Sequence, residues 1–220
     1  MSKRLTYVYI GLVLAIFLVS AWAYPQLPDV VATHWGLSGE PNGFSSAFFG
    51  AFFMPVFILG LALLFYFLPK IDPLKKNWEE FHSSYEIFVI VFVAVMGYIH
   101  GMTLVYNLGY AVNMSMILFP AMAVLFMTLG LLMPNIKQNW FMGIRTPWTI
   151  SDTTVWDKTH QLGGKLFLLA GLSAFVGVIY PEVGIYIFLS VVLIAAIVPL
   201  IYSYVLFKKQ NETGSIKSND

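Results

Sequence analysis

The chain is dominated by six long apolar runs, which are separated by short polar connections. The runs cover residues 5–23, 47–68, 84–106, 114–133, 162–180 and 183–207. About 20 mostly apolar residues are needed to cross the hydrocarbon core of a bilayer, which is roughly 30 Å thick. Backbone amides and carbonyls in lipid must find their partners inside the protein, so continuous runs of this length predict helices and not barrel strands. The predicted fold class is an all-α, polytopic membrane protein with six transmembrane helices.

The composition leaves no room for a separate soluble domain. Hydrophobic residues make up 59% of the chain and charged residues only 10%, with a mean hydropathy of +0.77, whereas roughly a quarter of residues are charged in soluble proteins. We divide the chain into 1–68, with two helices and an outer loop; 69–133, with the third and fourth helices; and 134–220, with a polar segment, two helices and a polar tail. The chain has no cysteine, so disulfides and thiolate chemistry are excluded.

The basic residues predict the orientation of the chain in the membrane. All 12 lysines and arginines lie before the first run, between the second and third, between the fourth and the start of the fifth, or after the sixth. Short cytoplasmic loops are enriched in lysine and arginine. The opposite connections carry only the acidic residues Asp29, Glu40 and Glu182. Both termini are therefore expected in the cytoplasm.

The first run has a second interpretation. Lys3 and Arg4, the apolar run and the sequence Ala21-Trp22-Ala23 imitate a signal peptide with its cleavage site. The run is longer than the roughly 7 to 15 apolar residues of a signal core. We therefore expect a retained membrane span, and cleavage would leave the orientation of the other loops unchanged.

Candidate binding residues lie on the predicted outer face. The outer loop, residues 24–46, is rich in proline, glycine and serine, so we expect it to form turns and not helix. His100 is the one ionisable residue well inside a run, in the outer half of the membrane, and such residues are functional candidates by default. Asp29, His34 and Glu40 share this side with His100 and could add metal ligands. The spacing matches no metal-binding motif, so we expect no metal and a hydrogen-bonded His100.

A polar segment, residues 139–164, lies between the fourth and fifth runs. Gly143 gives its backbone freedom, while Pro147 biases the residue before it toward an extended conformation. Arg145 is therefore presented from a stiff, non-helical stretch. Its guanidinium could pair with a lipid phosphate, with an aspartate of the segment, or with a bound partner.

The second half of this segment predicts a helix that continues into the fifth run. Ser151 or Asp152 is a suitable N-cap for a helix starting at residue 153. On that helix Trp156, His160 and Gly164 recur every four residues and share one face.

The aromatic residues of the segment allow a purely structural interpretation. Trp140, Trp148 and Trp156 are typical of an aromatic belt at headgroup depth, with a basic side chain reaching the interface. Such a belt would not require asparagine, glycine, threonine or histidine at fixed positions. We therefore expect those residues to have a more specific role.

These residues resemble the signature of the SdpI family of bacterial membrane proteins. The matching residues are Asn139, Gly143, Arg145, Thr146, Pro147, Trp148, Ser151, Trp156, Thr159, His160 and Gly163. Residues 27–29, 39–41, His34 and Ser45 also resemble a short region of unassigned function that often accompanies this signature. The resemblance implies a polytopic, non-enzymatic protein. The best understood member of the family protects its cell from an exported peptide toxin and holds a cytosolic transcriptional repressor at the membrane. The resemblance implies a similar role for this chain.

Two classes of function follow from the sequence. The first is an immunity or receptor protein that binds an exported peptide, membrane lipids and, at its inner face, a repressor; it needs no cofactor and contacts no nucleic acid directly. The alternative is a small channel or transporter, or an enzyme acting on lipid headgroups with Arg145 and His160. The runs carry no aspartate, lysine or arginine near their centres, which argues against ion-coupled transport.

Overall fold

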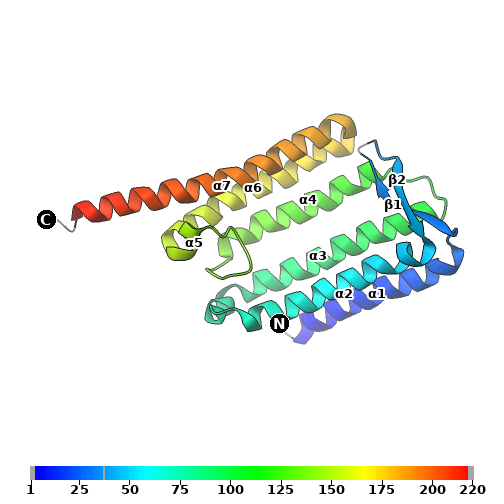
Figure 1. The fold of residues 1–220 in the computed structure, drawn as a ribbon, viewed down its shortest axis with the longest axis horizontal. Coiled ribbons are helices and arrows are strands. Elements are labelled where there is room, and N and C mark those ends of the chain that lie inside the picture. The colour runs from blue at the N-terminus through cyan, green and yellow to red at the C-terminus, as the bar shows by residue number, and fades with distance from the viewer. Residues whose placement is uncertain (1–2, 37, 218–220) are drawn as a thin grey trace.

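The computed structural model describes residues 3–36 and 38–217, with side chains for 6–36 and 38–212. Long helices lie side by side, with a small β-hairpin at one end of the bundle (Figure 1). The elements are α1 Lys3–Ala23, η1 Tyr24–Gln26, β1 Val30–Trp35, β2 Pro41–Ser46, α2 Ala47–Ile71, η2 Lys75–Asn77, α3 Trp78–Asn107, α4 Met114–Leu132, η3 Met133–Asn135, α5 Pro147–Ser151, α6 Thr153–Ile179 and α7 Pro181–Lys217.

In the part of the chain that the structure describes, six helices are long and apolar enough to cross a membrane, which confirms the predicted helical, six-span fold class. Several begin or end well outside the apolar runs: α3 starts at Trp78, α6 at Thr153, and α7 continues to Lys217. Hydropathy detects only the part of a helix that suits hydrocarbon, so polar turns beyond it are missed. The predicted helix start at residue 153 is confirmed, because the Asp152 side chain caps α6 by accepting from the Val155 amide at 2.8 Å.

The outer loop contains the main difference from the sequence prediction. In place of turns alone, β1 and β2 pair as an antiparallel hairpin, with Ala32 opposite Phe44. The β-branched residues Val30, Val31 and Thr33 favour this strand. The Asn107 side chain at the end of α3 binds the free edge of β1, donating to the Ala32 carbonyl at 2.9 Å and accepting from the Ala32 amide at 2.7 Å. The hairpin is thereby fixed to the top of α3.

The helices pack around two apolar clusters. One joins α1, α2 and α3 through residues such as Val13, Ile58 and Val89, and it extends to Ile136 and Trp156 beyond α4. The other joins α4, α6 and α7 through Phe119, Ala123, Ala174 and Phe188. The helices α4 and α6 approach closely at Gly130 and Gly164, where a Cβ on either glycine would collide with the backbone of the other helix.

The two ends of the bundle differ in charge. The helix ends that include Ile71, Trp78, Leu132 and Thr153 lie at one end (Figure 1). We call it the basic end, because the lysines and the arginine with described side chains belong to its connections and helix ends, except Lys165 inside α6. The side chains of Lys3, Arg4 and Lys217 lie outside the described residues. The opposite end carries β1 and β2, and we call it the hairpin end (Figure 1).

Candidate functional site

The candidate site is the polar segment at the basic end, which we call the signature segment, residues 139–160. It follows η3 in the chain and includes the short helix α5 and the start of α6. It is bonded to the connection between α2 and α3 through Asp72, and to α7 through Ser203. Most of its polar side chains are positioned by hydrogen bonds to the backbone.

Asn139 is completely buried, and its side chain organises the start of the segment. Its Oδ1 accepts from the amides of Phe141 at 2.8 Å and Met142 at 2.6 Å. Its Nδ2 donates to the carbonyls of Lys137 and Met142, both at 2.9 Å. An asparagine amide has two donors and an acceptor oxygen with two lone pairs, so Asn139 has no capacity left for a ligand.

His160 is buried on α6 and uses both ring nitrogens. Its Nδ1 lies 2.8 Å from the Trp156 carbonyl, and its Nε2 lies 2.9 Å from the Ile144 amide nitrogen. A carbonyl only accepts and an amide only donates, so Nδ1 carries the proton and the imidazole is neutral. His160 therefore holds the segment against α6 and has no free nitrogen to act as an acid or base.

Gly143 allows this contact between the segment and His160. Its φ of +105° is a conformation that favours glycine, and an added Cβ would collide with His160 Nε2. The glycine and the histidine thus form one structural unit.

Trp156 lies in the core and not in an aromatic belt, so the belt prediction is wrong for this residue. It is 1% exposed and stacks on His160 with 4.0 Å between ring centroids. Its Nε1 donates to the Ile136 carbonyl at 2.7 Å, so the indole N–H has a partner in the buried position. Trp140 is 49% exposed, and Trp148 packs against Tyr204 of α7.

Thr146 and Pro147 start α5. The Thr146 hydroxyl accepts from the Thr149 amide at 3.1 Å, and the Thr149 hydroxyl accepts in turn from the Thr146 amide at 2.8 Å. This reciprocal pair is a capping box. The Thr146 hydroxyl also lies 3.1 Å from the Ser203 hydroxyl, so the segment is tied to α7.

Arg145 is an exposed charged residue of the segment, as are Asp157 and Lys158 on α6. Its Nη1 donates to the Trp140 carbonyl at 2.6 Å. Within the part of the chain that the structure describes, it forms no ion pair with Asp152 or Asp157. The structure thus separates Arg145, which faces outward, from His160, which is enclosed. Thr159 is buried beside His160 on α6, and its hydroxyl has no partner among the described residues.

Asp72 was not predicted from the sequence, although it links two connections at the basic end. It is 2% exposed, and its Oδ2 accepts from the Trp78 indole at 2.9 Å and from the Trp140 amide at 3.0 Å. Next to it, the Asn77 side chain donates to the Gln138 carbonyl at 2.7 Å. No distinct sequence signal marked Asp72, because Glu79 and Glu80 lie in the same connection between the apolar runs.

The predicted outer residues are brought together only in part. His100 is buried and its Nε2 lies 2.7 Å from the Ser20 hydroxyl of α1, while His34 is exposed and bonded to Asn42. Both histidines line one cavity under the hairpin. Asp29 and Glu40 are exposed and do not line it. Among the described residues, no three histidine or acidic side chains are grouped to hold a metal ion.

Comparison with known proteins gives two matches to family models and one to a curated protein. Residues 135–203 match the SdpI/YfhL protein family, and residues 11–59 match a domain of unknown function (DUF1648). The chain is 30% identical over 200 residues to Immunity protein SdpI of Bacillus subtilis (strain 168), which covers 89% of this chain and 92% of the relative. The chain belongs to the SdpI family. No solved structure matches it.

The two family models match different parts of this SdpI family member. The match over 135–203 covers the signature segment, α6 and most of α7, and it ends at Ser203, the partner of Thr146. The match over 11–59 covers most of α1, the hairpin and the first half of α2. The SdpI/YfhL match thus covers the basic end, and the DUF1648 match covers the hairpin end, of a multi-pass membrane protein.

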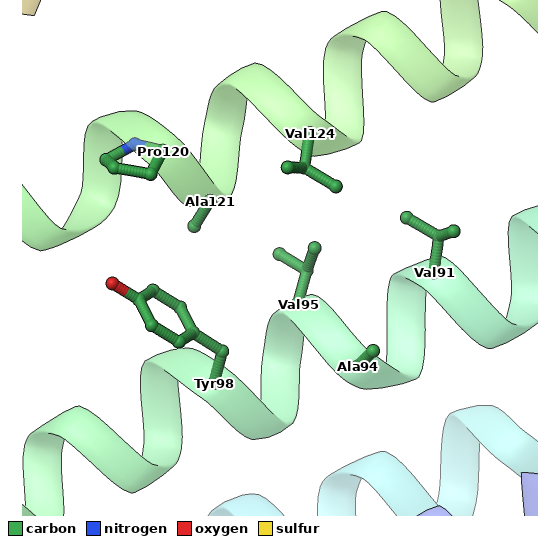
Figure 2. Close-up of a pocket in the computed structure, with 7 residues that line it drawn as sticks. All are labelled: Val91, Ala94, Val95, Tyr98, Pro120, Ala121 and Val124. Atoms are coloured by element: carbon green, nitrogen blue, oxygen red, sulfur yellow. The ribbon is translucent and has the colours of Figure 1, made fainter.

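An apolar groove of about 340 Å³ lies between α3 and α4 of this SdpI family member. Figure 2 shows Val95 and Tyr98 of α3 pointing toward Ala121 and Pro120 of α4. The Tyr98 hydroxyl is the one polar side-chain group among the residues that line it. The residues that line the groove include no charged side chain.

Proposed function

We propose that this protein gives resistance to, or senses, an exported antimicrobial peptide toxin, and that it does so without chemical turnover. The observation that carries the proposal is the 30% identity to Immunity protein SdpI over almost the whole of both chains. The aligned region makes up 89% of this chain and 92% of the relative, so the proposal does not depend on one local match.

The geometry of the signature segment supports a role without catalysis. The hydrogen-bonding groups of the Asn139 and His160 side chains are all bonded to the backbone. General acid or base catalysis needs a free group within reach of the substrate, and neither side chain has one. An enzyme acting on lipid headgroups with Arg145 and His160 would need both at one accessible place. Here His160 is 1% exposed.

The exposed part of the signature segment is the candidate surface for an inner partner. Arg145 has five N–H donors in a planar fork, and one nitrogen of that fork is bonded to the Trp140 carbonyl. The remaining donors suit a lipid phosphate or the carboxylates of a cytosolic repressor. A repressor held at the membrane would therefore bind around Arg145, with Trp140 beside it.

The proposal is tested by expressing the chain in a sensitive bacterium that lacks its own immunity gene. Survival is measured across doses of a panel of exported peptides, including any peptide encoded next to this chain, against cells carrying the empty vector. We expect a raised lethal dose for at least one peptide. Resistance to none of them, together with solute uptake or headgroup turnover in vesicles that depends on Arg145 or His160, would favour the small-molecule alternative.

A further inference from the structure

A cavity of about 430 Å³ lies at the hairpin end of the bundle, remote from the signature segment. Strand β1 forms part of its wall with Thr33 and Trp35, and α2, α3 and α4 contribute residues including Phe53, His100 and Leu118. Its volume falls in the range of about 300 to 1,000 Å³ that is typical of ligand sites.

Two side chains that line this cavity carry buried nitrogen atoms without partners. His100 is 2% exposed, and its Nε2 is bonded to Ser20 while its Nδ1 has no partner among the described residues. Trp35 packs edge-on against Tyr106, with 5.4 Å between ring centroids, and its Nε1 is buried and likewise unpaired in the described part of the chain. Buried polar atoms normally have hydrogen-bond partners, and each exception calls for a physical reason.

The lining selects for an uncharged ligand. Its polar side chains are Thr33 and His34 on β1 and His100 and Thr103 on α3, and most of the others are aromatic or aliphatic. No aspartate, glutamate, lysine or arginine is among the residues that line it. A charged group buried here would have no counter-ion and would pay a large desolvation cost.

We propose that this cavity binds an uncharged, apolar segment of the exported peptide, with Trp35 Nε1 donating to a peptide carbonyl and His100 Nδ1 bonded to a second polar group. The inference rests on the proposed function and names the place where recognition occurs. A peptide carries a donor and an acceptor at almost every residue, so it suits His100 in either tautomer. A lipid tail has no such groups, and part of the wall is the hairpin, which is not a transmembrane element.

The test measures binding by the full chain in phospholipid nanodiscs. The probe is a synthetic, N-terminally fluorescein-labelled copy of the panel peptide that the cells resist, and binding is followed by fluorescence anisotropy. Trp35→Phe keeps a six-membered ring against Tyr106, and it removes the unpaired N–H together with the pyrrole part of the indole. We expect its Kd to rise about fivefold, the effect of one neutral hydrogen bond, while its Tm stays at the value of the unchanged protein. Trp22→Phe is the matched control, because Trp22 is 64% exposed on α1 and does not line the cavity.

A second variant fills the cavity. Leu118→Trp should abolish binding, whereas Leu131→Trp, at an exposed position near the other end of α4, should not change it. Unchanged binding by both Trp35→Phe and Leu118→Trp, with resistance intact, would overturn this inference and leave the proposed function standing. A lower Tm for Trp35→Phe, with a Kd no higher than that of Trp22→Phe, would overturn it in favour of a structural role for the indole. A phospholipid retained by the purified protein and lost from Leu118→Trp, detected by native mass spectrometry, would overturn it in favour of a lipid site. If no panel peptide is resisted, the proposed function has failed and the inference fails with it.

Discussion

Asn139 and His160 are polar side chains enclosed at the basic end, and each has all of its hydrogen-bonding groups paired with nearby backbone. Replacing such a residue leaves buried backbone groups without partners, which costs about 1 to 3 kcal/mol for each group. Substitutions here should therefore lower the stability of the protein before they affect any binding event.

Gly143 gives a direct test at this scale. Gly143→Ala places a Cβ against His160 in a left-handed backbone conformation, and we expect it to lower the free energy of unfolding by more than about 1 kcal/mol. The measurement is the Tm of the purified protein in detergent. Gly60→Ala is the control, because an added Cβ there meets no atom within 4 Å and alanine favours a helix. Equal Tm values for Gly143→Ala and the unchanged protein would contradict the described contact.

The positions of the signature residues were predictable from the sequence, but their surroundings were not. The spacing of Trp156 and His160 placed them on one helix face, as the structure has them. The burial of Trp156 depends on the Ile136 carbonyl, 20 positions earlier in the chain, and hydropathy carries no information about such a pairing. The unpaired indole of Trp35 and the role of Asn107 could not be predicted for the same reason.

At the scale of elements, short connections hold the long helices in place. Asp72 joins the connection between α2 and α3 to the signature segment through the Trp140 amide. It also accepts from the Trp78 indole and the Leu74 amide, so one carboxylate fixes three groups. At the other end, Asn107 plays the equivalent part for the hairpin.

Asp72→Ala should release the start of the signature segment from the bundle. Three donors would lose a charged acceptor, and hydrogen bonds to charged groups contribute about 1.5 to 3 kcal/mol each. We expect faster trypsin cleavage after Lys137 or Arg145 in inside-out vesicles, together with a lower Tm. Glu79→Ala, at an exposed acidic position nearby, should behave like the unchanged protein. Resistance of Asp72→Ala to trypsin would show that other contacts hold the segment.

The elements themselves were predictable to different degrees. The six spans follow from hydropathy, because lipid imposes the same requirement on every residue of a run, and the structure has a long helix at each. The hairpin was missed because proline and glycine in residues 36–43 indicated turns. The strand signal is confined to the short β1, whereas its partner β2 has the sequence PNGFSS, which does not favour a strand.

The whole molecule has a basic end formed by the signature segment and a hairpin end with a cavity. Of the 12 lysines and arginines in the sequence, all except Lys165, which lies inside α6, belong to connections or helix ends at the basic end. This distribution predicts that the basic end faces the cytoplasm. The peptide would then meet the hairpin end, and a cytosolic partner would meet Arg145.

Single introduced cysteines test this orientation in a chain that has none of its own. A cysteine at Ser38 should react with a membrane-impermeant maleimide in intact cells, and a cysteine at Ser151 should react only after the cells are opened. Both positions are exposed, so accessibility in water does not separate them. The reverse pattern would place the hairpin inside the cell and remove the basis for peptide recognition there.

We propose that the two ends of the molecule have different roles: the signature segment stabilises the fold, and the hairpin end recognises the peptide. The most direct test compares peptide resistance with the amount of folded protein in the same cells. Resistance is the lethal dose from survival curves, and the folded amount is the monodisperse peak on size-exclusion chromatography. Asn139→Ala should lose resistance only in proportion to its loss of folded protein, while Trp35→Phe should keep its folded amount and lose resistance. A full amount of folded Asn139→Ala without resistance would contradict the account, because the signature segment would then act on the peptide or its signal directly.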